Sequence, residues 1–216
     1  MMFKMRVLKA LYKCGIVAVV RGTTKEVGIR ISESCINGGV NAIEITYTNK
    51  FANEIIKELS EKYKNCEDIV IGAGSVLDAE TARMAILAGA QYVVSPSFNR
   101  ETAKLCNRYN VPYIPGIMTI NEIVSAYESG VDIIKLFPGN AFGQGYISSV
   151  KGPLPHANIM VTGGVNLDNI GTWAKAGASL VGIGGELNKL GEVGKFEEIV
   201  LTCKEYINKL NEARSN

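Results

Sequence analysis

The feature that most constrains this chain is a regular alternation of short apolar runs with longer amphipathic stretches. Eight runs have the length of β-strands, at residues 16–20, 42–46, 69–71, 92–94, 112–114, 133–137, 159–162 and 180–183. Such alternation is typical of parallel strands joined by helical crossovers. Eight units favour an α/β fold closed as a (β/α)8 TIM barrel over an open, doubly wound sheet.

Helix boundary signals lie between these runs. Thr23 with Glu26, and Thr119 with Glu122, have the spacing of capping boxes, which predicts that helices begin there. Glycines that precede the next strand predict helix ends with a positive backbone φ. These glycines are Gly39, Gly89, Gly130 and Gly177.

Glycine-rich segments close the seventh and eighth runs, at residues 162–166 and 182–185, where many barrels bind phosphate. The segment after the first run, residues 20–23, lacks the glycine fingerprint of a dinucleotide-binding fold. We therefore expect one domain over residues 1–216. Residues 1–14 form an N-terminal helix under the barrel, and residues 15–212 form the barrel and its outer helices.

Composition excludes several classes of protein. The 216 residues are 47% apolar with a net charge of +2 and no basic block, which argues against a nucleic-acid partner. Apolar stretches are too short to span a membrane, and the N-terminal residues lack the core of a secretion signal, so we expect a cytoplasmic protein. Five scattered cysteines fit neither a disulfide framework nor a zinc site.

Two charged residues interrupt predicted strands: alternation directs Glu44 into the barrel, and apolar neighbours on both sides place Lys135 in its interior. Glu44 shares a face with Thr46 and Thr48, and Lys135 lies within the apolar run 133–137. Desolvation there favours the neutral amine, the form that attacks a ketone and makes a Schiff base. The alternative is a buried structural ion pair between Lys135 and Glu44.

Other candidates lie at the predicted carboxyl ends of strands, where such barrels do their chemistry. Arg21 follows the first strand on the face of Val17 and Val19. Small residues and prolines there leave room for a ligand, although each alone is also typical of an ordinary loop. They include Gly72, Gly74, Ser75, Pro96 and Pro115.

Six motifs together resemble the 2-keto-3-deoxy-6-phosphogluconate (KDPG) and 4-hydroxy-2-oxoglutarate aldolases. The resemblance runs from about Gly15 to Glu186, with the motifs in the family's order. They are Glu44-Ile-Thr-Tyr-Thr48, Gly72-Ala-Gly-Ser-Val76, Val94-Ser-Pro96, Pro115-Gly-Ile-Met-Thr119, Lys135-Leu-Phe-Pro138 and Thr162-Gly-Gly-Val165.

The resemblance implies a class I aldolase that needs no metal or other cofactor, is usually a homotrimer, and cleaves a keto acid to pyruvate and an aldehyde. It makes Lys135 the Schiff-base lysine and Glu44 the general acid/base. Some members hold the substrate carboxylate with an Arg where this chain has Thr48, and others with an Arg on strand one, as Arg21 is here. The resemblance assigns the pyruvate end of the substrate to Arg21, Thr48, Gly72, Ser75 and Pro96.

The phosphate end is expected at backbone amides of Gly163, Gly164, Gly184 and Gly185. Glu186 departs from the family, which often has a Ser near this position, and a carboxylate there would repel a phosphate. Phosphate affinity is therefore left open.

Several functions remain as alternatives. The substrate could be KDPG, its 6-phosphogalactonate epimer or 4-hydroxy-2-oxoglutarate. A phosphate-binding barrel isomerase or synthase would share the glycine-rich segments but not Lys135 facing Glu44. A sugar-phosphate binding protein would keep the fold without the chemistry.

Overall fold

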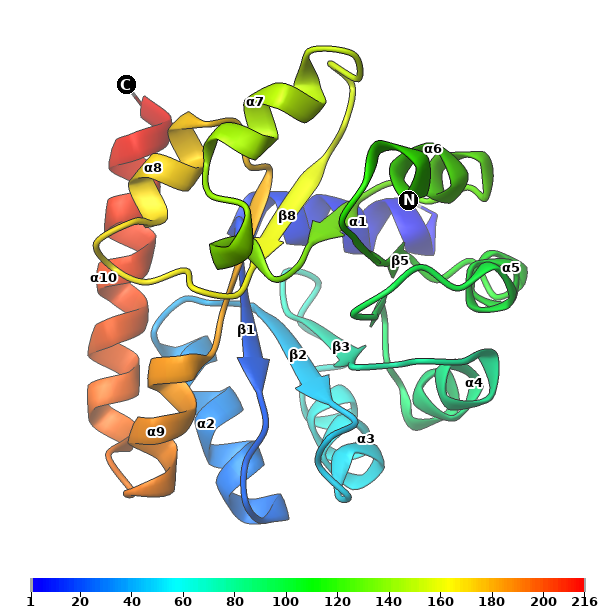
Figure 1. The fold of residues 1–216 in the computed structure, drawn as a ribbon. Coiled ribbons are helices and arrows are strands. Elements are labelled where there is room, and N and C mark those ends of the chain that lie inside the picture. The colour runs from blue at the N-terminus through cyan, green and yellow to red at the C-terminus, as the bar shows by residue number, and fades with distance from the viewer. Residues whose placement is uncertain (1, 216) are drawn as a thin grey trace.

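The computed structural model describes residues 2–215, which form a barrel of parallel strands surrounded by helices (Figure 1). The strands are β1 (Ile16–Val20), β2 (Ala42–Thr46), β3 (Val70–Gly74), β4 (Val93–Val94), β5 (Tyr113–Ile114), β6 (Gly116–Ile117), β7 (Ile134–Leu136), β8 (Ile159–Thr162) and β9 (Leu180–Ile183). The α-helices are α1 (Phe3–Cys14), α2 (Lys25–Asn37), α3 (Ala52–Lys62), α4 (Ala79–Ala88), α5 (Arg100–Arg108), α6 (Ile120–Glu128), α7 (Gly145–Lys151), α8 (Ile170–Lys175), α9 (Gly185–Glu192) and α10 (Phe196–Ser215). A short 3-10 helix, η1 (Gly139–Ala141), follows β7.

The sheet closes at its fifth strand, which is divided in two. The order is β5-β4-β3-β2-β1-β9-β8-β7-β6, so the two ends of the sheet, β5 and β6, are separated along the chain only by Pro115. Proline has no N–H to donate, and the ladder changes partner around it. The Lys135 N–H donates to the Pro115 carbonyl at 2.8 Å, and the Gly116 N–H donates to the Ser95 carbonyl at 2.9 Å. The eight expected strands are thus observed as nine segments.

The observed helix boundaries agree with the capping boxes and glycines identified in the sequence, except at the start of α2. The capping box of Thr119 and Glu122 is present at the start of α6, and the four glycines that precede strands all have positive φ. The capping box expected at Thr23 is wrong. Helix α2 begins at Lys25, one residue later than that box requires, and Thr24 is its cap, accepting the Val27 N–H at 3.2 Å.

Strand alternation divides the core into two clusters. One lies between the strands and the outer helices and includes Ile43 and Ile45. The other fills the barrel and includes Val17 and Tyr92, together with Leu11 of α1. Helix α1 therefore closes the barrel at the amino ends of the strands, which leaves the carboxyl ends open for a site.

Candidate active site

Lys135 and Glu44 meet inside the barrel. They lie on β7 and β2, which are four barrel strands apart and so face each other across the interior. Their side chains are 6% and 1% exposed, and Lys135 Nζ lies 3.8 Å from Glu44 Oε1. This distance is within ion-pair range but too long for a hydrogen bond. The structure thus brings together the two residues that the sequence singled out for chemistry.

The surroundings of Glu44 leave one of its oxygens available. Oε2 is buried and has no hydrogen-bond partner among residues 2–215. A buried ion pair that only fills space is stabilising when its remaining lone pairs are satisfied, and those of Oε2 are not satisfied within residues 2–215. This oxygen is therefore available to accept a hydrogen bond from a bound ligand.

Glycines on β3 make the room that Glu44 occupies. A Cβ on Gly74 would lie 2.6 Å from the carboxyl carbon of Glu44, and a Cβ on Gly72 would lie 2.5 Å from a ring carbon of Tyr92. Gly72 is thus needed for packing Tyr92, and the space beside it is not open to a ligand. Burial raises the pKa of Tyr92 well above its ordinary value, and the nearby Glu44 charge adds to this effect.

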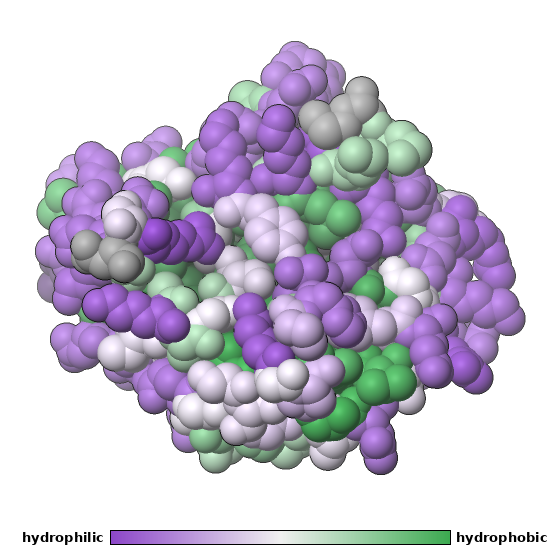
Figure 2. All heavy atoms as spheres, turned by 90° about the horizontal axis from the view of Figure 1, so that it is seen from above, coloured by the Kyte–Doolittle hydropathy of each residue, from purple (hydrophilic) through white to green (hydrophobic). Residues whose placement is uncertain are grey.

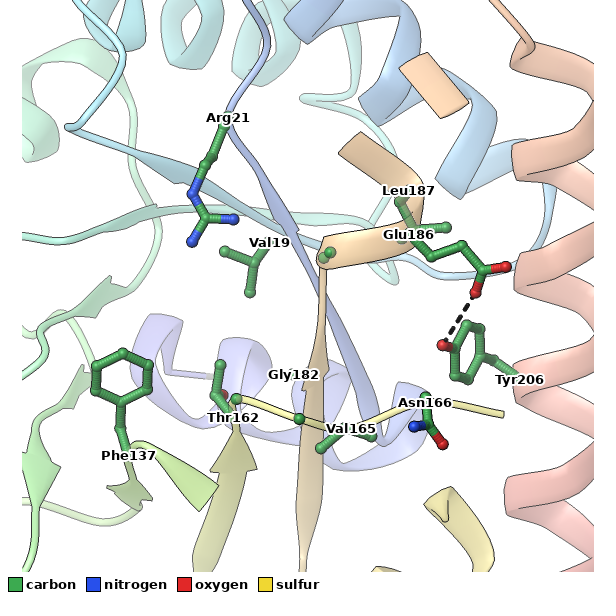
Figure 3. Close-up of a pocket in the computed structure, with 14 residues that line it drawn as sticks. Val19, Arg21, Phe137, Thr162, Val165, Asn166, Gly182, Glu186, Leu187 and Tyr206 are labelled. Carbon is green, nitrogen blue, oxygen red and sulfur yellow. Dashed lines mark hydrogen bonds between the residues drawn. The ribbon is translucent and has the colours of Figure 1, made fainter. Parts of the chain in front are cut away.

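Apolar surface borders Lys135 on the mouth side. Its Nζ lies 5.0 Å from the centroid of the Phe137 ring. Phe137 also lines a pocket of about 350 Å³ at the carboxyl ends of β1, β8 and β9 (Figure 3). Lys135 and Glu44 therefore lie beside an open pocket large enough for a small organic acid.

This pocket brings Arg21 together with the four glycines expected to bind phosphate. The Arg21 guanidinium projects over Val19 toward the pocket, and within residues 2–215 it forms no ion pair (Figure 3). The pocket is lined by Val19, Arg21, Phe137, Thr162, Gly163, Gly164, Val165, Asn166, Gly182, Gly184, Gly185, Glu186, Leu187 and Tyr206.

Two backbone segments of the pocket suit an anion. Gly163 and Gly164 both have positive φ, 94° and 79°, a conformation that favours glycine. Helix α9 begins at Gly185 without a side-chain cap, so its first-turn N–H groups have no side-chain acceptor at the cap. N–H groups of this kind bind phosphate or carboxylate.

Glu186 borders the same pocket, but its carboxylate turns away from Arg21. It accepts a hydrogen bond from the Tyr206 hydroxyl of α10 at 3.4 Å (Figure 3). Burial raises the pKa of Tyr206, and the Glu186 charge raises it further. An anion bound at the start of α9 would therefore lie near the Glu186 carboxylate but not in direct contact with it.

The remaining predicted residues lie outside this pocket. The Thr48 hydroxyl is 2.7 Å from that of Thr46 at the end of β2. Ser75, with φ 57°, follows β3, and the Pro96 carbonyl packs against Gly116 at the end of β4. These three residues border the barrel mouth on the side of Glu44, whereas Arg21 belongs to the pocket.

Three polar residues were not singled out as site residues from the sequence. Thr162 ends β8 in the pocket wall, and its buried hydroxyl has no partner among residues 2–215. Asn49 and Asn188 are buried and bond to the backbone around Arg21. The sequence could have indicated Thr162, because it is a polar residue at the end of the apolar run 159–162. It could not have indicated the two asparagines, because their hydrogen-bond partners are distant in the chain.

Within residues 2–215 no group of three or more His, Cys, Asp or Glu side chains is arranged to hold a metal ion. None of the helices described there is long and apolar enough to cross a membrane. The five cysteines are free, and Cys35, Cys106 and Cys203 are buried.

Comparison with known proteins decides the family. Residues 7–200 match the family described as KDPG and KHG aldolase. The chain belongs to this family. A 2-dehydro-3-deoxy-phosphogluconate aldolase of Treponema pallidum is 34% identical over 165 residues, which cover 76% of this chain and 77% of that protein. A 2-dehydro-3-deoxy-6-phosphogalactonate aldolase of Escherichia coli is 30% identical over 181 residues, covering 83% and 87%.

Structural comparison agrees with this KDPG and KHG aldolase assignment. A solved structure described as native KDPGal superposes with a TM-score of 0.86 at 27% identity, and covers 93% of this chain and 96% of its own. The expected barrel and the expected family are both confirmed. Because the members are aldolases, which are carbon–carbon lyases, the isomerase or synthase alternative is not supported.

Proposed function

We propose that this aldolase works through a Schiff base on Lys135, with Glu44 as general acid/base, and releases pyruvate and an aldehyde. The observation that carries the proposal is the buried pair itself. An amine and a carboxylate with an unpartnered oxygen face each other at 3.8 Å beside an open pocket. In the low dielectric of the barrel interior, proton transfers between them and a bound keto acid need little reorganisation.

The chemistry follows from these two groups. The Lys135 amine attacks the C2 ketone, and Glu44 gives and takes the protons needed to lose water from the carbinolamine. The resulting iminium accepts the electron pair of the C3–C4 bond as that bond breaks, while Glu44 takes the C4 hydroxyl proton and the aldehyde leaves. The enamine is then protonated at C3, and water hydrolyses the iminium to pyruvate and the free amine.

The substrate carboxylate would bind Arg21, whose guanidinium projects into the pocket and forms no ion pair within residues 2–215. Thr48, Ser75 and Pro96 would border the pyruvate end from the side of Glu44. Gly72 would act indirectly, by letting Tyr92 pack behind Glu44.

The distal end of the substrate would lie at the glycine-rich segments. Backbone amides of Gly163, Gly164, Gly184 and Gly185 suit the phosphate of KDPG or of its galactonate epimer. Glu186 reduces the gain from a phosphate, so the shorter 4-hydroxy-2-oxoglutarate, which yields glyoxylate, is a competing substrate of the same site.

The chain would act as a homotrimer in the cytoplasm. Large apolar side chains are exposed on α4 and α6, which flank α5 on one side of the barrel (Figure 1). They include Met84, Leu87, Ile120 and Val124. Hydrophobic side chains also reach the surface between hydrophilic ones in the view from above (Figure 2). A ring of three copies would cover such a surface, and free thiols suit a reducing compartment.

Borohydride trapping tests the mechanism. Pyruvate and borohydride together should inactivate the enzyme and leave a reduced adduct on the peptide that contains Lys135, while EDTA should leave turnover unchanged. Lys135→Arg should abolish trapping and turnover, because a guanidinium is a poor nucleophile. Lys151→Arg, on α7, is the matched control and should behave as wild type.

An adduct on another lysine, or loss of activity with EDTA, would overturn the proposed mechanism. Absence of both turnover and trapping in the wild-type protein would favour the sugar-phosphate binding protein instead. A coupled assay of pyruvate release then ranks KDPG, its galactonate epimer and 4-hydroxy-2-oxoglutarate as substrates.

A further inference from the structure

Two buried asparagine side chains hold the backbone of Arg21 where the sheet can no longer do so. The ladder between β1 and β9 ends at the pair Ala18 and Ile183, because the chain leaves β9 at Gly184 and enters α9. Beyond that point, the carbonyl of Val19 and the N–H of Arg21 have no strand beside them on the β9 side, although β2 continues on the other side. Unpaired backbone groups of this kind are costly when buried.

Asn188, in the second turn of α9, takes the place of the missing strand. Its Nδ2 donates to the Val19 carbonyl at 2.8 Å, and its Oδ1 accepts the Arg21 N–H at 2.8 Å. In a parallel ladder, one residue bonds both to the carbonyl before and to the N–H after the residue opposite it. The Asn188 amide reproduces this pattern opposite Val20. Its side chain is 6% exposed, so water competes little for these bonds.

Asn49 holds the same segment from the other side. It lies in the loop after β2 and is 8% exposed. Its Nδ2 donates to the carbonyls of Arg21 and Gly22, the latter at 3.1 Å, and its Oδ1 accepts the Phe51 N–H at 2.8 Å. Arg21 is thus bonded through its N–H to one asparagine and through its carbonyl to the other.

Gly184 makes the first of these contacts possible. A Cβ at this position would lie 2.6 Å from the Val19 carbonyl oxygen and 3.4 Å from Asn188 Nδ2. Asn188 Nδ2 also donates to the Gly184 carbonyl at 2.6 Å. The same side chain therefore joins the strand that carries Arg21 to the glycine-rich start of α9.

We propose that Asn188 and Asn49 are positioning residues that act through Arg21, keeping its guanidinium where it binds the carboxylate of the keto acid. The proposal rests on the carboxylate role given to Arg21 in the proposed function. A long Arg side chain loses considerable rotamer entropy when it is held in one place, and a fixed backbone confines that loss to its own torsions. The two amides thus preorganise a binding group without touching the substrate.

Imine trapping with pyruvate alone tests this idea, because pyruvate has no distal group to reach the glycine-rich segments. Asn188→Leu and Asn49→Leu should each raise the pyruvate concentration for half-maximal trapping about tenfold, with a nearly unchanged trapping rate at saturation. Arg21→Ala should raise that concentration on the order of 10²-fold. Asn188→Asp keeps the acceptor for the Arg21 N–H but loses both donated bonds, and should fall between wild type and Asn188→Leu.

A double-mutant cycle separates positioning from general damage. In the Arg21→Ala background, Asn188→Leu should cause no further rise, because its effect passes through the guanidinium. Asn158→Ala is the matched control: this partly buried asparagine donates to the Asp132 carbonyl at 3.2 Å near the start of β8, away from the pocket. It should alter thermal stability without changing the response to pyruvate.

The outcomes distinguish this inference from the proposed function. If wild-type protein is not trapped at Lys135, the proposed function fails. If wild type is trapped but both Leu variants, folded by circular dichroism, keep the wild-type half-saturation, the positioning role fails alone. An equal rise for Asn188→Leu with and without Arg21 would also overturn it. Should the Leu variants fail to fold, Asn188→Asp and Asn49→Asp decide by the same measurement.

Discussion

Replacing Gly74 by Ala displaces the Glu44 carboxylate, the proposed acid/base, without removing Glu44 or Lys135. The added Cβ would lie 2.6 Å from the carboxyl carbon of Glu44. That carbon must retreat by at least about 0.8 Å before ordinary van der Waals contact begins at 3.4 Å, and Oε1, the Glu44 atom nearest to the added Cβ, must retreat further. Because Glu44 is 1% exposed and the barrel is packed around it, the carboxylate has little freedom to retreat except by changing its position relative to Lys135 Nζ.

A misplacement of about 1 Å can cost on the order of 10²-fold in rate, so we expect Gly74→Ala to lower kcat by about that factor. The assay is steady-state pyruvate release, with thermal unfolding followed by circular dichroism to show that the barrel persists. Gly145→Ala is the matched control, because nothing lies within 4 Å of the Cβ it would add at the start of α7. It should keep wild-type turnover.

A second substitution, at Glu44, tests whether the Gly74→Ala effect acts through the carboxylate position. Glu44→Asp shortens the side chain by one methylene and should recover part of the activity when combined with Gly74→Ala, although it impairs the enzyme alone. A folded Gly74→Ala variant with wild-type kcat would refute the reasoning, since the carboxylate position would then not govern the rate.

Three further changes test other parts of the molecule. Glu44→Gln should keep the fold but cut turnover by about 10² to 10⁴ and slow imine formation; near-normal activity would make Glu44 a structural partner of Lys135. Glu186→Ser should increase the preference for a 6-phosphorylated over an unphosphorylated substrate in kcat/KM, and an unchanged ratio would mean that Glu186 stays clear of the substrate. The Thr81 N–H, 2.6 Å from the Asp78 carboxylate, holds the pKa of Asp78 below its ordinary value. Asp78→Ala should cost about 1 kcal/mol of unfolding free energy at pH 7. That difference should shrink as the pH falls through the lowered pKa, and a pH-independent difference in urea unfolding would contradict this.

Local rules account for much of the barrel. Period-two alternation placed Glu44 on an inward face and apolar neighbours placed Lys135 in the interior. The capping box at Thr119 marked a helix start correctly, and the glycines before strands marked helix ends. These features depend on residues within a turn or two of each other. The wrong prediction at Thr23 is also a local one, because the neighbouring Thr24 offers an equivalent capping hydroxyl one residue later.

Other features depended on contacts between distant segments. Pro115 divides the fifth strand at the point where the barrel closes, a position set by β4 and β7 on either side. The room beside Gly72 is filled by Tyr92, which directly precedes β4, although the small size of Gly72 suggested space for a ligand. The direction of Glu186 is set by Tyr206, which lies twenty residues away on α10.

The sequence by itself determined the barrel, its order of strands and helices, and the interior positions of Glu44 and Lys135, because hydrophobic periodicity and helix capping are local properties of a chain. Only the tertiary structure decided how these residues meet and what holds them. Lys135 and Glu44 come within 3.8 Å because β2 and β7 face each other across a closed barrel. Asn188 reaches the backbone of Arg21 across 167 residues because β9 ends where α9 begins. Such contacts depend on how strands far apart in sequence pack together, which no local pattern records.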